Sequence, residues 1–159
     1  MIPEAPFLFS IAGLSASLAG LAGLVVGLRR GTDMRPLDMF RLREIVAFSF
    51  ANVLFAISIV PASVVAGSSE PAIRVAALTS LIYAIVSGLY LARSTRLEGI
   101  PWTLGWLAGV ILLNGGVLAI GLVAAFTGSI GWYEALLVIM LARPMFAFTL
   151  VIESFGHSD

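Results

Sequence analysis

The residue with the strongest claim to a chemical role is Arg143, a single cation flanked by two long apolar runs. Placing a guanidinium near the middle of a bilayer costs at least about 2.5–3.5 kcal/mol on insertion scales, so a partner must compensate for the burial. At about 1.5 Å of rise per residue, Arg143 lies roughly 16 Å beyond Trp132 along a helix. Glu134 is an acid on the same predicted helix, but the helical period places it on the opposite face from Arg143. The sequence therefore predicts a partner on another helix.

Uncharged polar residues in neighbouring segments are the candidate partners of Arg143. Asn114 lies near the middle of its own apolar run, and on an adjacent antiparallel helix it reaches a similar depth. We expect a hydrogen bond between these two side chains. The other members of this candidate mid-membrane polar site are Asn52, Ser80 and Ser87.

Two functions are open for such a site. In the first, the polar groups bind one another and fasten the bundle through interhelical hydrogen bonds of about 0.6–2 kcal/mol each. In the second, Asn52, Asn114 and Arg143 line a cavity that takes an anion or a neutral solute. A dry, hydrogen-bonded arginine favours the first function, and a continuous polar cavity favours the second.

Enzyme chemistry has little support in the sequence. There is no cysteine, and the single histidine, His157, lies in the polar tail, which removes the usual metal clusters and histidine-based triads. No carboxylate lies deep in a predicted span, which argues against proton- or sodium-coupled transport of the usual kind. We therefore expect no enzymatic activity and no cofactor. We also expect no nucleic-acid partner, because the charges lie close to the membrane and no nucleic-acid-binding motif is present.

The apolar content dictates the elements that must position these residues. Hydrophobic residues make up 60% of the 159 residues, above the roughly 45–50% typical of globular proteins. Charged residues cluster between long uncharged runs, which is typical of several membrane spans. The predicted fold class is all-α, a single-domain polytopic transmembrane helical bundle of about five spans. The spans are residues 6–28, 45–67, 74–93, 101–126 and 132–152. The fifth is the weakest, since Arg143 could instead mark a re-entrant or surface-lying segment.

The arginines predict the orientation in the membrane. Seven of the nine lie in or beside the first loop and the loop after the third span, and positively charged loops face the cytoplasm. We expect the N-terminus outside, the C-terminus in the cytoplasm, and the bacterial inner membrane as the location. The first loop also offers contacts to anionic lipid headgroups, although the same charges serve simply to set the topology. These arginines are Arg29, Arg30, Arg35, Arg41 and Arg43.

Small residues at four-residue spacing mark candidate helix interfaces, because they let helix backbones approach closely. The positions are Gly23, Gly27, Ala84, Gly88, Gly105 and Gly109. Packing within one chain accounts for most of them, and a subunit interface is the sharper interpretation. The leading hypothesis is a small membrane protein that self-associates or joins another membrane protein as an assembly subunit. The alternative is a small channel or carrier, and an anion or anionic lipid is a further candidate partner.

Overall fold

The structure is a computed structural model that describes residues 4–28, 36–97 and 104–156. It contains α1 (Ala5–Leu28), α2 (Pro36–Ala66), α3 (Ser69–Leu97), α4 (Leu104–Thr127) and α5 (Ile130–Gly156). Within these ranges all regular structure is helical, and each of the five helices is long and apolar enough to cross a membrane. The predicted all-α membrane bundle with five spans is confirmed. Which end faces the cytoplasm stays a prediction.

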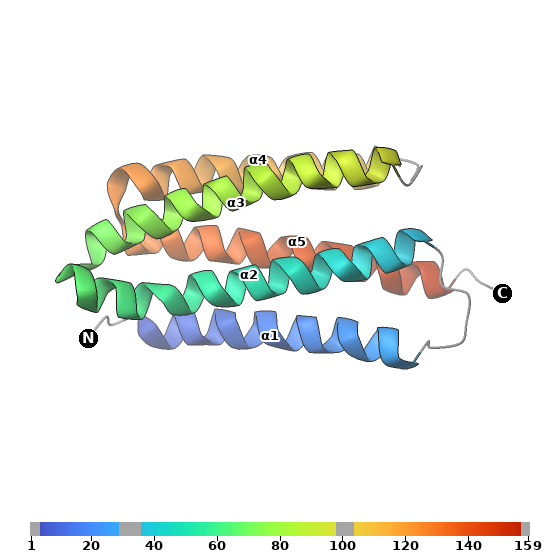
Figure 1. Cartoon of the computed structure of the whole chain (residues 1–159), viewed down its shortest axis with the longest axis horizontal. Coiled ribbons are helices and arrows are strands. Elements are labelled where there is room, and N and C mark those ends of the chain that lie inside the picture. Colours follow the sequence, from blue (N-terminus) through green and yellow to red (C-terminus); the bar gives the residue numbers. More distant parts are fainter. Residues whose placement is uncertain (1–3, 29–35, 98–103, 157–159) are drawn as a thin grey trace.

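The five helices run alternately in opposite directions (Figure 1). At one end α2 turns into α3 and α4 turns into α5, next to the start of α1. At the other end α1, α3 and α5 finish, and α2 and α4 begin. We call this the arginine-rich end, after four arginines of α2 and α3 near it: Arg41, Arg43, Arg93 and Arg96.

Glycine closes both tight turns at the opposite end. Gly67 follows α2 with φ 70° and Gly128 follows α4 with φ 64°. The N–H of Gly128 donates to the carbonyl oxygen of Ala124 at 2.9 Å. This left-handed conformation ends a helix at little cost only in the absence of a Cβ. The chain can therefore start α3 and α5 after only two residues.

α5 is the central helix and contacts all four others. Its residues Tyr133, Leu136, Leu137 and Met140 belong to a buried core that draws on every helix. α5 is continuous from Ile130 to Gly156 and is long and apolar enough to cross a membrane, which favours a span over the re-entrant or surface-lying alternative. The helix with a mid-span arginine thus occupies the position that offers most neighbours.

The outer surface of the bundle is strongly apolar. Large side chains such as Leu54, Val64 and Leu112 are 68%, 78% and 75% exposed. Soluble proteins rarely expose contiguous apolar surface of this kind, whereas lipid solvates it without cost. The packing therefore agrees with the composition that hydrocarbon surrounds these helices.

Candidate functional site

The side chain of Arg143 points into the bundle and contacts two other helices. The residue is 7% exposed. Its Nη1 donates to Asn114 Oδ1 of α4 at 2.7 Å, and its Nη2 donates to Glu44 Oε1 of α2 at 3.4 Å. The hydrogen bond predicted between Arg143 and Asn114 is present. The ion pair with Glu44 is buried too, with side-chain exposures of 8% and 14%.

An aromatic face completes the surroundings of the guanidinium. The Cζ atom of Arg143 lies 3.6 Å from the centroid of the Phe48 ring, where the negative face of the ring attracts a cation. Tyr83 of α3 meets Phe48 edge-on, with 5.5 Å between ring centroids, and its hydroxyl donates to the carbonyl oxygen of Ala47 at 3.3 Å. We refer to Arg143, Glu44, Asn114 and Phe48 as the Arg143 cluster.

Helical register brings the members of the Arg143 cluster together. Glu44 and Phe48 are four residues apart on α2 and therefore share one face. Glu44 lies about 12 Å from the start of α2 and Asn114 about 15 Å from the start of α4, at about 1.5 Å per residue. Since both helices begin at the arginine-rich end, the two side chains reach comparable depths. Asn114 is held in place because its Nδ2 donates to the carbonyl oxygen of Val110 at 2.8 Å.

The cluster neutralises a buried cation and joins three helices. The carboxylate supplies the opposite charge, the amide supplies an acceptor, and the ring covers one face of the guanidinium. Buried charges are stable when paired and hydrogen-bonded in this way. What the arrangement can do is fasten α5 to α2 and α4. A guanidinium occupied by these partners and 7% exposed leaves little room for a free anion.

The remaining candidate polar residues form hydrogen bonds to groups other than Arg143. Asn52 lies eight residues after Glu44 on α2, and its Nδ2 donates to Ser15 Oγ at 3.0 Å and to the carbonyl oxygen of Leu137 at 3.3 Å. It therefore joins α2 to α1 and α5 at a second level. The hydroxyls of Ser80 and Ser87 donate to carbonyl oxygens of their own helix, those of Ala76 and Ala84. None of these hydrogen bonds involves a member of the Arg143 cluster.

Of the arginines that the sequence assigns to the first loop, the structure describes two, and both lie on α2. Arg29, Arg30 and Arg35 lie outside the described residues. Arg41 is 7% exposed and donates to the carbonyl oxygen of Leu150 on α5 at 3.3 Å, so it lies within the bundle. Arg43 is exposed.

The small residues also separate into inward and outward groups. Ala84 is buried in the core, and a Cβ at Gly109 would meet Cε1 and Cζ of Phe146 at 2.5 Å. In contrast, the positions where an added Cβ would meet nothing within 4 Å are Gly23, Gly27, Gly88 and Gly105. Ala84 and Gly109 thus take part in close packing within the chain, whereas the four glycines border open space.

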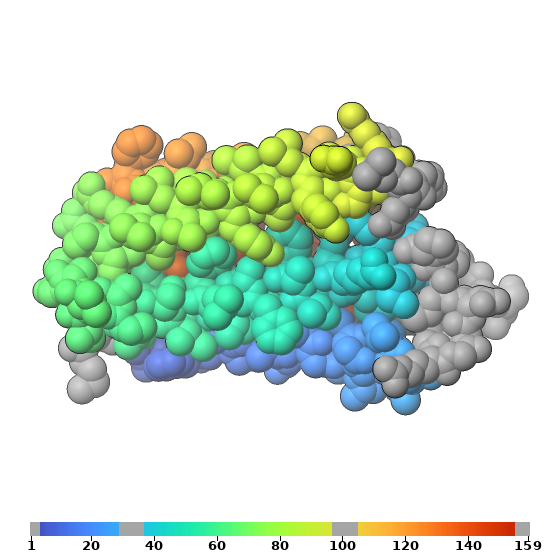
Figure 2. All heavy atoms as spheres, in the orientation of Figure 1, coloured from blue at the N-terminus to red at the C-terminus, as the bar shows by residue number. Residues whose placement is uncertain are grey.

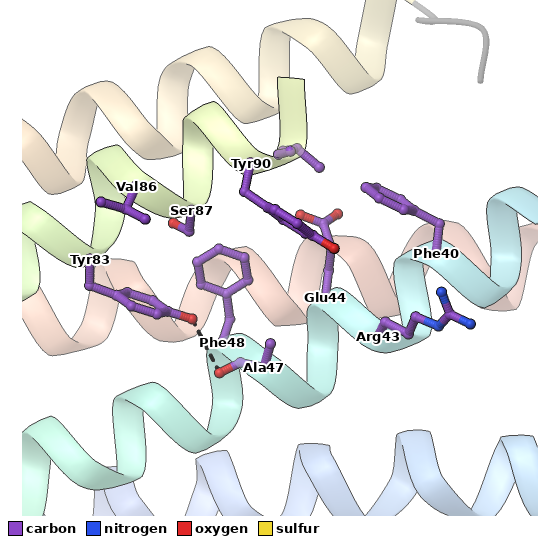
Figure 3. A pocket seen from close by; sticks show the side chains of 10 residues that line it. Phe40, Arg43, Glu44, Ala47, Phe48, Tyr83, Val86, Ser87 and Tyr90 are labelled. Carbon is purple, nitrogen blue, oxygen red and sulfur yellow. Dashed lines mark hydrogen bonds between the residues drawn. The ribbon is translucent and has the colours of Figure 1, made fainter. Parts of the chain in front are cut away.

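A pocket opens between α2 and α3 beside the Arg143 cluster (Figure 3). It has a volume of about 400 Å³, and its polar lining comes from Arg43, Glu44, Tyr83, Ser87 and Tyr90. Figure 2 shows the face of the molecule on which α3 and α2 lie side by side. The Glu44 carboxylate therefore belongs both to the ion pair and to the pocket wall.

Glu44 and Phe48 are the functional residues that sequence reasoning missed. Glu44 lies one residue before the predicted span 45–67, and α2 carries it into the bundle because the helix begins at Pro36. The available signal was the amphipathic start of α2, whose helical register puts Glu44 on one face with Phe48. Aromatic residues are too common in membrane helices for Phe48 to stand out.

Known proteins provide no guide to this site. Comparisons with protein-family models, with curated proteins and with solved structures return no significant match. In the part of the chain that the structure describes, no three histidine, aspartate or glutamate side chains gather as a metal site would require. The site is therefore interpreted from its own geometry.

Proposed function

We propose that this protein is an assembly subunit of the membrane, with α1 as the helix that docks against a second copy of the chain. The observation that carries the proposal is the outward face of α1, which consists largely of small residues. Its small members are Gly13, Ala16, Ser17, Gly20, Gly23 and Gly27, all exposed, and the exposed Phe9 and Leu24 lie in the same arc. At about 100° per residue these positions fall within one face about 120° wide.

This face lies opposite the side of α1 that packs inside the bundle. The buried residues of α1 are Leu8, Ile11, Ala12, Ser15, Ala19 and Ala22. Glycines facing lipid gain little, because they expose backbone and weaken a helix by about 1 kcal/mol each relative to alanine. Against another helix the same glycines permit close backbone approach. Small residues on both the buried and the outward side of α1 therefore support a helix with neighbours on both sides.

The closed surroundings of Arg143 support a fastening role in preference to conduction. A channel or carrier lined by Asn52, Asn114 and Arg143 needs these groups to share one wet path. Asn52 instead joins α1 and α5 at a separate level, and the guanidinium is held by Asn114, Glu44 and Phe48. The proposal assigns no enzymatic reaction to the chain and places it in a bacterial inner membrane.

Self-association is tested by energy transfer between labelled copies in liposomes. Because the chain has no cysteine, a single Ser158→Cys substitution labels each copy once with donor or acceptor. We expect transfer that rises with the protein-to-lipid ratio. Gly20→Leu, at the centre of the outward face of α1, should weaken association by about tenfold, equal to about 1.4 kcal/mol.

The matched control is Gly115→Leu on α4, which is also an exposed helical glycine with open space around it. It should leave the energy transfer unchanged. Transfer that is absent in the original chain, or lowered equally by both substitutions, would contradict docking through α1. Anion flux through liposomes that is lost in Arg143→Gln would support the channel instead.

A further inference from the structure

The pocket between α2 and α3 has features of a lipid site that the proposed self-association does not require. It opens on a face that lipid contacts, because Val86 and Tyr90 on its wall are 59% and 72% exposed. Phe40, Phe48 and Leu91 contribute further apolar surface. A volume of about 400 Å³ is at the small end of ligand pockets, which span about 300–1,000 Å³. It therefore suits part of an amphiphile, with the remainder in the bilayer.

The charges around the pocket favour an anionic group. Glu44 is the acid in the lining, and the Arg143 guanidinium pairs with it at 3.4 Å, so its charge is compensated. Arg43 is the cation in the lining; it is exposed, and among the described residues it has no hydrogen-bond or ion-pair partner. The pocket with its buried ion pair thus carries a net charge of about +1.

Arg43 lies on the side of the pocket nearer the arginine-rich end of the bundle. Arg43 lies about 10 Å along α2 from its start at the arginine-rich end, by helical rise. Figure 3 shows Arg43 and Phe40 at the edge of the pocket nearer the start of α2, with Tyr83 and Val86 farther along. Because the ends of spanning helices reach the membrane surfaces, the cation lies nearer a surface than Tyr83 and Val86 do, which is the order of parts in a lipid molecule.

We propose that this pocket binds an anionic phospholipid, with its phosphate at Arg43 and the start of an acyl chain against Phe48, Val86 and Tyr90. Basic pockets between spanning helices recognise anionic headgroups by this combination of charge and apolar wall. Arg43, which the sequence groups with the first-loop arginines, thus lies on α2 at a pocket whose walls come from two helices.

Native mass spectrometry of the purified protein with equimolar phosphatidylglycerol and phosphatidylcholine tests this proposal. We expect the phosphatidylglycerol adduct to predominate. Arg43→Gln should lower its apparent affinity about fivefold, since one arginine near the surface contributes about 1 kcal/mol. Ala47→Leu, which fills the pocket without changing charge, should also lower it.

Two matched variants separate the pocket from general effects. Arg93→Gln removes an exposed arginine of α3 that does not line the pocket, and Ala108→Leu enlarges an exposed alanine of α4. Neither should change the affinity. Equal retention of the two lipids, or an equal loss in Arg43→Gln and Arg93→Gln, would overturn the proposal. Displacement of the lipid by millimolar glycerol phosphate would show a phosphate site instead of a lipid site.

Discussion

Replacing Glu44 by glutamine removes the negative charge beside Arg143 while keeping the size of the side chain and a hydrogen-bond acceptor. The guanidinium would then be a buried cation that has lost its counter-charge. At the observed 3.4 Å, unit charges attract by about 5 kcal/mol at an effective dielectric constant of about 20. Removing one partner of a buried ion pair typically costs about 3–5 kcal/mol. We expect a loss of about 3 kcal/mol in the free energy of unfolding, since the amide can still accept.

The surface pair of α3 provides the matched control. Arg74 and Glu70 approach more closely, at 2.7 Å, but their side chains are 46% and 61% exposed. Exposed pairs at this helical spacing contribute only about 0.3–0.5 kcal/mol. Glu70→Gln should therefore have a small effect although its ion pair is the shorter one. The comparison tests whether burial decides the strength of an ion pair, because distance alone predicts the larger loss of stability for Glu70→Gln.

The assay is unfolding by sodium dodecyl sulfate in dodecylmaltoside micelles, followed by circular dichroism. The double variant Glu44→Gln with Arg143→Gln leaves two neutral amides, so it should be more stable than either single variant. Two results would refute the reasoning: a Glu44→Gln protein that unfolds at the original detergent fraction, or a double variant that loses the sum of the two single effects.

Two further substitutions test single contacts by the same titration. Phe48→Leu removes the ring that covers Arg143 and should lower the free energy of unfolding by about 1–2 kcal/mol. The control Phe50→Leu, at an exposed position, should change it little. Equal losses in the two variants would contradict the cation–π contact. Gly128→Ala forces a Cβ into the left-handed region and against Glu70, which should cost about 1–2 kcal/mol or more. Gly115→Ala, at an exposed position within a helix, should instead raise the free energy of unfolding by up to about 1 kcal/mol. If both substitutions stabilised the protein, or both destabilised it, the role assigned to Gly128 would be wrong.

The sequence predicted how deep a polar side chain lies along its helix better than it predicted which neighbouring helix that side chain faces. Arg143 and Asn114 could be matched because each lies far from its helix ends, and an antiparallel neighbour brings such positions to one level. Asn52 was grouped with them because it is polar and within a span. Its partners, Ser15 and Leu137, depend on how α2 is rotated against α1 and α5, and a nearly uniform apolar helix carries little information about that rotation.

The number of helices follows from the amino-acid sequence alone, because each apolar run must satisfy its own backbone by coiling when hydrocarbon surrounds it. The same reasoning requires a partner for Arg143. Which partner it takes is a property of the tertiary structure: Glu44 becomes interior only when α2 extends back to Pro36 and packs beside α5. The division of the glycines into inward and outward groups has the same origin. Lipid and protein interiors are almost equally apolar, so hydropathy cannot distinguish a face that meets lipid from one that meets another helix.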